Sequence, residues 1–508
     1  MYGSMASPFY VPHATTPGDF GNLDPEIAYR RWLAEHPPDV ATLRMLAVLL
    51  GKRAQFDEAT RLLERAVQLT PYDPGLYNDL GVTCEQAGDP SGAARWYRQS
   101  LRLQPDSDRV WSNLASALFR ISDFDGAADA ARKALALQPR NVLAHVTLGG
   151  ALLNTGSFQD ALSAYRRALQ LCPDHPQAHC NYGLALLLHG DYQEGWKEHE
   201  WRRKLANPFF QRPGPAWDGS DARGQMVLLY GEGGLGNIIQ FARYVPLVHE
   251  RGARVIVECQ NDLAAMIATI SGVSQVVSRE NPCPDPHAHC PLTSLPALFN
   301  TRLDTIPATV PYLHLPTSQI ERWRPIVNQL RGLKVGVCWK GSQPFTIPRS
   351  RSIEPRHLLP LTRIAGVNLV SLQHGEQPPA DLPLLTLPGL EPESMSFDDA
   401  AAVMMHMDLV IACDTSIAHL AGALGRPTWV ALGYFADWRW MLDRDDTPWY
   451  PTMRLFRQKR LDDWEGVIAR MANELSALSA SKDASTTAAA TMRQELRENH
   501  MGLQNFFL

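Results

Sequence analysis

The chain has 508 residues, 45% of them hydrophobic and 20% charged, and is long enough for two to four globular domains. Its 48 Lys and Arg against 53 Asp and Glu exclude the broad basic field that binds nucleic acid non-specifically. The sequence has no apolar run of about 18 residues and no charged-then-apolar order at residues 1–21. Its eight cysteines are dispersed, as in a reducing compartment. These features predict a cytoplasmic protein without a membrane span.

The first two hundred residues repeat with a period of 34. Prolines mark the period at Pro37, Pro71, Pro105, Pro139 and Pro173, and small residues keep it at Ala59, Ala93, Ala127 and Ala161. A fixed period of this length is typical of stacked helix pairs. We therefore predict an all-helical solenoid over residues 23–207, with a capping helix near 27–35 and a flexible segment at 1–22 before it.

The period and its small residues resemble the tetratricopeptide repeat, a 34-residue helix–turn–helix, in four clear units and a degenerate fifth. Such arrays bury their core only between neighbouring repeats and bind extended peptides on a concave face. Asn78, Asn113 and Asn181 are expected on that face, because an amide can both donate to and accept from a peptide backbone. Alternatively, the array scaffolds or dimerises the rest of the chain, and the asparagines are ordinary polar surface.

After a linker at 208–223, apolar runs alternate with helical segments. We expect strands at 226–230, 255–258, 335–339, 368–372, 409–413 and 428–432. This alternation predicts parallel sheets with crossover helices. We expect two Rossmann-like halves, at 224–320 and 333–475, with a junction near 318–333 and a low-complexity tail at 476–508.

A glycine-rich turn follows the first of these strands. Gly231, Gly233 and Gly236 form the pattern G-x-G-x-x-G together with Glu232 and Gly234, and Glu258 follows 22 residues after Gly236. This spacing is that of a dinucleotide-binding turn, so a nicotinamide-dependent oxidoreductase has to be considered. A purely structural tight turn explains the glycines as well.

A second turn, after the strand at 409–413, is more specific. Asp414, Thr415 and Ser416 stand together at a helix start, and His419 follows one turn later. Their hydroxyls and amides, with the positive end of the helix, suit a diphosphate. The alternative is that Asp414 only caps the helix and that His419 is a packed core residue.

These two turns carry a further resemblance, together with the runs Trp217-Asp218-Gly219, 334–339 and Arg349-Ser350-Arg351-Ser352. They resemble the glycosyltransferase family that includes the ADP-heptose:lipopolysaccharide heptosyltransferases, and especially bacterial proteins that join tetratricopeptide repeats to such a domain. The arrangement is also similar in outline to O-linked N-acetylglucosamine transferases. The resemblance implies a GT-B fold, inverting transfer from a nucleoside-diphosphate sugar, and no metal or cofactor.

The resemblance also implies roles for individual residues. Asp414, Thr415, Ser416 and His419 would hold the diphosphate and sugar of the donor. Lys340 or Arg351 would neutralise the leaving phosphates, with Ser342 in the same loop. Fixed cations aimed at developing negative charge lower the barrier without a metal ion.

One departure concerns the general base. The family's glycine-rich turn usually ends in Gly-Leu-Gly-Asp, and this chain has Asn237 in place of the aspartate. An amide cannot take up the acceptor's proton. Either Glu232 or another residue, such as a histidine, replaces the base, or transfer is slow, or the chain only binds.

Cys283, His287, His289 and Cys290 offer metal-ligand types, but their tight spacing and the neighbouring prolines make a tetrahedral site awkward, and we predict no metal. We predict a cytoplasmic glycosyltransferase whose repeats recruit a protein acceptor, such as a flagellin, an autotransporter or another surface protein. The rivals are a catalytically weak or dead scaffold and, last, the oxidoreductase. The sequence leaves the sugar, the nucleotide, the acceptor and a homo-oligomeric state open.

Overall fold

The computed structural model describes residues 24–205, 212, 214–278, 285–341 and 351–482. They form two compact units. The first unit contains residues 24–186 and 198–205, and the second contains residues 187–197 and the described residues from 212 onward. The expected flexible segment 1–22 lies outside the described residues.

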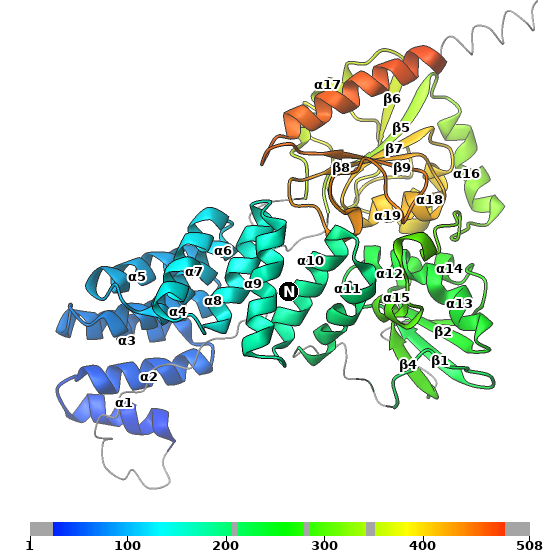
Figure 1. The fold of residues 1–508 in the computed structure, drawn as a ribbon. Helices are drawn as coiled ribbons and strands as arrows, with labels where there is room; N and C mark the ends of the chain where they lie inside the picture. Colours follow the sequence, from blue (N-terminus) through cyan, green and yellow to red (C-terminus); the bar gives the residue numbers. More distant parts are fainter. Residues whose placement is uncertain (1–23, 206–211, 213, 279–284, 342–350, 483–508) are drawn as a thin grey trace, which may run out of the picture. The chain divides into compact units, whose positions relative to one another are not determined.

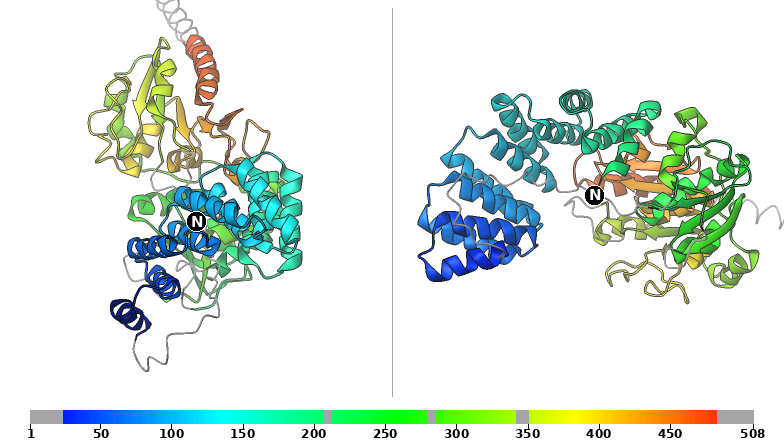
Figure 2. Two further views of the ribbon diagram at one scale, coloured as in Figure 1. Left: turned by 90° about the vertical axis from the view of Figure 1, so that its left-hand side faces the viewer. Right: turned by 90° about the horizontal axis from the view of Figure 1, so that it is seen from below.

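The first unit is the predicted stack of helix pairs (Figure 1). After α1 (Pro25–Glu35), four pairs follow in order: α2 (Val40–Lys52) and α3 (Phe56–Leu69), α4 (Pro74–Gln86) and α5 (Pro90–Leu103), α6 (Asp108–Arg120) and α7 (Phe124–Leu137), α8 (Val142–Asn154) and α9 (Phe158–Leu171). Most of α10 (Pro176–His189) also belongs to this unit, whereas most of α11 (Tyr192–His199) belongs to the second. Acidic, amide or hydroxyl side chains at Asp39, Asp73, Asp89, Ser107, Asp123 and Asn141 cap helix starts by accepting backbone N–H groups. The helices from α1 to α9 each contact the next along the chain, and Figure 2 shows them as a stack.

The period of small residues is confirmed as the packing rule of this unit. Ala59, Ala93, Ala127 and Ala161 are all fully buried. A Cβ atom at Gly81 would lie 2.4 Å from the ring of Tyr97, and one at Gly149 would lie 2.7 Å from the ring of Tyr165. Glycine is therefore required where an aromatic ring of the second helix lies against the first.

Polar side chains link successive repeats. Arg44 pairs with Asp79 of the next repeat, and Asn113 Nδ2 donates to Asn78 Oδ1 at 3.1 Å. In both pairs, a residue in the first helix of one repeat contacts a residue in the first helix of the next repeat. The two residues are 35 positions apart, which is one more than the period of 34. Burial raises the pKa of Asp79, and the guanidinium of Arg44 opposes that shift.

The second unit contains two parallel sheets. The four-stranded sheet has the order β3-β2-β1-β4, with β1 (Met226–Tyr230), β2 (Arg254–Cys259), β3 (Val273–Ser278) and β4 (Ala288–Pro291). The five-stranded sheet has the order β6-β5-β7-β8-β9, with β5 (Leu333–Cys338), β6 (Val367–Ser371), β7 (Leu409–Cys413), β8 (Thr428–Leu432) and β9 (Met453–Arg457). Their helices are α12 (Leu235–Phe241), α13 (Val245–Glu250), α14 (Asn261–Ile267), α15 (Leu295–Leu298), α16 (Thr317–Val327), α17 (Leu359–Thr362), α18 (Phe397–Met404) and α19 (Ser416–Ala423).

All six strands expected from the sequence are present, three of them with the bounds expected. The sequence missed β3, β4 and β9. The short strand β4 lies in the Pro-rich stretch, and β3 carries exposed polar residues, so neither forms an apolar run. The expected junction near 318–333 begins inside α16, which packs beside α18.

Two expected boundaries differ from the structure. We expected the repeat array to end at 207, but residues 187–197, which include most of α11, belong to the second unit. We expected a tail from 476, but residues 464–482 are helical, and Lys482 Nζ lies 2.5 Å from Asp408 Oδ2. The helix continues because Val467, Ile468, Met471 and Leu475 bury one face in the core of the five-stranded sheet.

An aromatic cluster explains where α11 belongs. Tyr192 and Trp196 of α11 pack on Phe241 of α12 and on Trp438 and Trp449, which follow β8. Tyr192 accepts a hydrogen bond from Trp449 Nε1 at 3.0 Å. The helix therefore contacts elements next to both sheets.

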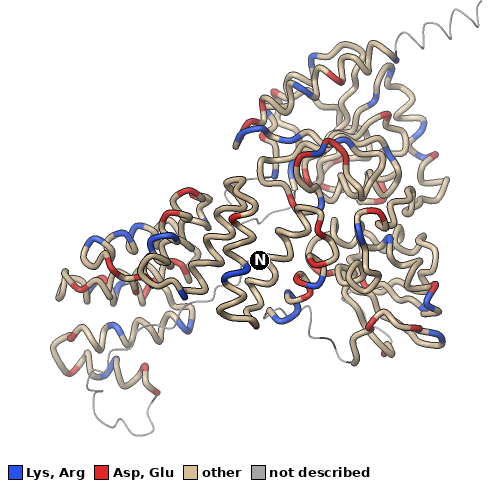
Figure 3. The backbone as a smooth tube through the Cα atoms, viewed as in Figure 1, with Lys and Arg blue, Asp and Glu red and all other residues tan. Residues whose placement is uncertain are grey.

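Acidic and basic side chains are interspersed along the described chain, with no large region of one sign (Figure 3). Among the described helices, none combines the length and the apolar character needed to span a bilayer.

Candidate functional site

The turn between β7 and α19 buries a carboxylate beside a cation. Asp414 is 4% exposed, and Arg351 Nη1 lies 3.4 Å from its Oδ2. Burial raises the pKa of Asp414, and the charge of Arg351 opposes that shift. Thr415 is the N-cap of α19, although its side chain makes no capping hydrogen bond, and half-buried Ser416 is the first helical residue. The three residues stand at a helix start as the sequence predicted.

His419 lies one turn into α19. Its Nδ1 is 2.9 Å from the hydroxyl of Tyr450, and its ring stacks on Trp440 with centroids 5.4 Å apart. Burial lowers the pKa of His419 well below its usual value, and the positive charges of Arg439, Arg243 and Arg351 add to that shift. The imidazole is therefore neutral at neutral pH.

The side chain of Gln373, which sequence reasoning missed, holds the loop after β5 in place by hydrogen bonds. Gln373 Oε1 accepts from the backbone N–H groups of Trp339 at 3.1 Å and of Lys340 at 2.9 Å, while its Nε2 donates to the carbonyl of Lys340 at 3.0 Å. The side chain of Lys340 pairs with Glu376 and is about a third exposed. Ser342 lies outside the described residues. The signal for Gln373 was available, since it is the polar residue after the apolar run expected at 368–372, as Asp414 is after the run at 409–413.

The glycine-rich turn is ordered around Asn237. Gly233 has a φ of 77°, and a Cβ there would lie 2.7 Å from Asn237 Nδ2. Asn237 Nδ2 donates to the carbonyl of Glu232 at 3.1 Å, and Arg439 Nη2 donates to Asn237 Oδ1 at 2.8 Å. The side chain of Asn237 thus holds the turn together.

The same turn approaches His419. A Cβ at Gly236 would lie 2.8 Å from His419 Cδ2 and 3.4 Å from Nε2. The structure therefore brings Gly236, Asn237 and Arg439 together with His419, and brings Asp414 together with Arg351. Gly231 and Gly234 shape the same loop, and Glu232 is buried in it.

The asparagines of the repeat array differ from the expectation of an exposed row. Asn78 is 3% exposed and Asn113 is 7% exposed, because their amides bond to each other between repeats. Asn181 is half-buried and accepts from Gln177 Nε2 at 2.8 Å. Sequence spacing placed these residues on the first helices but could not show that two of them pair.

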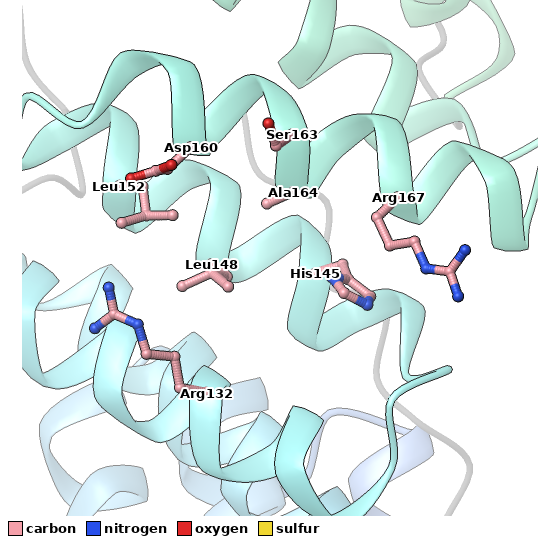
Figure 4. A pocket seen from close by; sticks show the side chains of 8 residues that line it. All are labelled: Arg132, His145, Leu148, Leu152, Asp160, Ser163, Ala164 and Arg167. Carbon is pink, nitrogen blue, oxygen red and sulfur yellow. The ribbon is translucent and has the colours of Figure 1, made fainter.

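A pocket of about 370 Å³ lies elsewhere on the array, between α7, α8 and α9 (Figure 4). Leu148, Leu152 and Ala164 form an apolar floor, and the charged residues that line the pocket are Arg132, Arg167 and Asp160. Both guanidinium groups are on exposed residues. The pocket is therefore lined by both signs of charge around an apolar floor, and it can take an apolar side chain.

The residues that would serve a dinucleotide site or a metal site have other partners in the structure. The carboxylate of Glu258, which a dinucleotide fold would direct at ribose, accepts from Arg212 Nη2 at 2.5 Å. His287 Nδ1 accepts from the backbone of Met226, and His289 Nε2 lies 3.2 Å from the carbonyl of Gly214. Cys283 lies outside the described residues, and within those described no three ligand-type side chains come together as a metal site.

Comparison with protein families gives two matches. Residues 44–108, 112–176 and 153–195 match the tetratricopeptide repeat. Residues 392–435 match glycosyltransferase family 9 (heptosyltransferase). The second match includes α18, β7, α19 and β8 and therefore the turn with Asp414 and His419.

Among curated proteins, the chain is 28% identical over 327 residues to protein FlbA of Caulobacter vibrioides, covering 57% of this chain and 53% of that protein. The chain thus matches about half the length of this relative. Among solved structures it is similar to MamA (24% identical, 31% of this chain and 93% of that chain, TM-score 0.29). It is also similar to YrrB, described as a tetratricopeptide repeat protein with an unusual peptide-binding site (20% identical, 36% and 92% covered, TM-score 0.28).

Residues 24–186 are thus a stack of helix pairs that matches the tetratricopeptide repeat, and two parallel sheets follow it. The chain therefore combines tetratricopeptide repeats with an α/β region in which residues 392–435 match the heptosyltransferase family of glycosyltransferases.

Proposed function

We propose that this chain is a glycosyltransferase that moves a sugar from a nucleoside-diphosphate sugar to a protein acceptor. The observation that supports the proposal most is the turn Asp414-Thr415-Ser416 with His419, because it lies inside the segment matching the glycosyltransferase family. Arg351, which is partly exposed, stands beside it. The transfer is proposed to invert the anomeric centre, to need no metal ion or cofactor, and to take place in the cytoplasm.

The proposed chemistry follows from charge. When the bond between the anomeric carbon and the diphosphate breaks, the departing group gains negative charge. Arg351 and Lys340 can neutralise it, and the hydroxyls of Thr415 and Ser416 at the start of α19 can donate to phosphate oxygens. Asp414 can accept from sugar hydroxyls, because a buried carboxylate gains most from such partners.

A thermal-shift panel tests the donor site. The full chain is heated with ADP, GDP, UDP, CMP and the matching nucleotide sugars, and with NAD, because a ligand that binds only the folded state raises its melting temperature. We expect one nucleoside diphosphate to stabilise the chain, and Asp414→Ala to lose that response. Absence of any response would favour the scaffold, and a response to NAD alone would favour the oxidoreductase.

The repeat array is proposed to recruit the acceptor. The pocket between α7, α8 and α9 is a candidate contact, since its apolar floor fits an apolar side chain of the acceptor. The test is transfer of a labelled sugar from the stabilising donor to proteins of a cell extract. We expect discrete labelled proteins with the full chain, and a weaker signal with Leu148→Glu, which places a charge on the pocket floor.

A further inference from the structure

The second helices of three successive repeats, α5, α7 and α9, carry only basic charges in their C-terminal halves. These halves contain neither Asp nor Glu, and all of their charged side chains are exposed: Arg98, Arg102, Arg132, Lys133, Arg166 and Arg167. In α3, the second helix of the first repeat, Glu64 stands at the position of Arg98. Elsewhere in the array both signs of charge are mixed, so these six side chains form a local basic patch (Figure 3).

The repeat places the members of the basic patch in rows. Arg98, Arg132 and Arg166 follow one another at the period of 34, and Lys133 and Arg167 occupy the next position of their repeats. Residues one period apart take equivalent places on successive repeats. The positive charges therefore continue from one second helix to the next along the array.

Neutral groups hold several of these cations. Lys133 Nζ lies 4.4 Å from the centroid of the Trp111 ring. Arg166 Nε donates to the hydroxyl of Tyr182 at 3.0 Å. An aromatic ring or a hydroxyl orients a cation without cancelling its charge. The basic patch is therefore partly ordered before a partner arrives, and it keeps positive charge for that partner.

Two acidic side chains lie near the basic patch. Asp129 pairs with Arg132 at 3.1 Å, but both side chains are more than half exposed, and such a pair contributes little. Asp160 lines the pocket between α7, α8 and α9. Figure 4 shows Asp160 and Arg167 at opposite ends of this pocket, and about 10 Å of helix axis separates them. Neither carboxylate therefore neutralises the rows.

The helix dipole does not explain the basic patch. Cations are favourable near the C-terminus of any helix. However, the first helices α4, α8 and α10 contain neither Lys nor Arg. The basic residues thus gather on the second helices, where the dipole is no stronger.

The patch also includes an apolar contact. Arg132 and Arg167 line the pocket of about 370 Å³ whose floor is formed by Leu148, Leu152 and Ala164. A phosphate backbone would meet the cations but leave this floor without a partner. A polypeptide with carboxylates and an apolar side chain would contact both.

We propose that the basic patch on α5, α7 and α9 binds an acidic segment of a partner protein. The carboxylates of the segment lie against the rows of Arg and Lys, and one of its apolar side chains occupies the pocket. The surface includes the pocket offered above as an acceptor contact. The proposal does not depend on glycosyl transfer, because binding is measured without turnover.

The test selects peptides from a random 12-residue library displayed on phage, with the full chain immobilised. We expect the retained peptides to share several Asp or Glu and at least one large apolar residue. They should be lost from a triple variant of the patch, Arg98→Gln with Lys133→Gln and Arg167→Gln. The matched control removes the same charge from exposed residues of the second unit, and it should retain the peptides: Arg254→Gln with Arg331→Gln and Arg363→Gln.

Fluorescence anisotropy with the most enriched peptide then measures Kd. We expect the patch variant to bind about 10-fold more weakly or worse, because several exposed ion pairs are lost together. Salt should weaken binding to the unaltered chain as well, since it screens exposed charges. Both triple variants should melt like the unaltered chain, because every substituted residue is exposed.

Three outcomes would overturn the proposal. Retained peptides without acidic residues, or no retained peptide, would deny the charge complementarity. Equal weakening by the two triple variants would show that net charge acts rather than the patch. Binding of a single-stranded oligonucleotide or of anionic lipid vesicles in place of peptides would assign the surface to another partner. Failure of the proposed glycosyl transfer is distinguishable, because it leaves peptide binding intact.

Discussion

Asp414, whose carboxylate is buried at the start of α19, is the residue on which the proposed donor site depends most. Asp414 is buried, its pKa is raised by that burial, and Arg351 at 3.4 Å offsets only part of the cost. Groups retained against stability in this way are typical of functional sites.

The pKa shift gives a signed prediction for Asp414→Asn. A raised pKa means that the folded chain holds the proton more tightly than the unfolded chain. The wild type therefore loses stability as pH rises from the ordinary value of an aspartate through the raised one. The variant should lack this loss, so its melting temperature should exceed that of the wild type above that window, with the difference vanishing in acid. A gain of roughly 1 kcal/mol would appear as ~2–4 °C in a domain of this size.

Gln373 gives a second prediction at this scale. Gln373→Ala leaves the buried backbone N–H group of Trp339 and the partly buried one of Lys340 without their acceptor, which should cost about 1–3 kcal/mol of unfolding free energy. Chemical denaturation measures the loss. Gln377→Ala, which removes an exposed amide four residues later, is the control and should change stability by less than about 0.5 kcal/mol.

Sequence reasoning placed Asp414 and His419 at a strand-to-helix turn, but it did not give their partners. Asp414 and His419 were identifiable because a polar run after an apolar strand falls at the carboxyl edge of a parallel sheet. The contacts of His419 with Tyr450 and Gly236 join residues far apart in the chain, and no periodicity encodes them. The asparagines show the same limit, because spacing placed Asn78 and Asn113 on one side of the array but could not reveal that they face each other.

At the scale of elements, the helix pairs depend on glycines that meet aromatic rings. Gly81→Ala and Gly149→Ala should each destabilise the chain by about 1–3 kcal/mol, because a Cβ there overlaps the rings of Tyr97 and Tyr165. Thermal unfolding measures both. Gly51→Ala is the matched control: its Cβ would meet only the side-chain oxygen of Gln86 at 3.3 Å, so the better helix propensity of alanine should leave stability equal or higher.

The buried pair between α2 and α4 gives a further prediction. Arg44→Met leaves Asp79 charged and buried, which should cost about 3–5 kcal/mol. The double change Arg44→Met with Asp79→Leu removes both charges and should recover most of that loss. Equal losses in the single and double variants would show that the ion pair itself, and not the stranded carboxylate, carries the effect.

At the scale of the whole molecule, the second unit includes α11, although the repeat pattern assigns that helix to the array. The period of 34 continues into it, so sequence reasoning placed the boundary at 207. The aromatic faces of Tyr192 and Trp196, which pack on Trp438 and Trp449, determine the structural boundary instead. Amphipathic pattern predicts that a helix packs, but not which surface it packs on.

This boundary predicts the behaviour of fragments. A fragment of residues 187–508 keeps the aromatic cluster, whereas residues 208–508 would expose the surfaces that α11 covers. Each large side chain buried there contributes roughly 1.5–3 kcal/mol, so the shorter fragment should melt lower and aggregate. Size-exclusion chromatography and thermal melting compare the two. Equal stability of both fragments would contradict the placement of α11.

The polar contacts between repeats also restrict how such an array could change its length. Arg44 meets Asp79 in the next unit, and Asn78 meets Asn113 in the one after, so each joint uses a different pair. Loss of the second unit by recombination would set a buried guanidinium against an amide and leave it without its counter-ion. The units are therefore alike in shape but not interchangeable, and the polar contacts at these two joints depend on the order of the units along the chain.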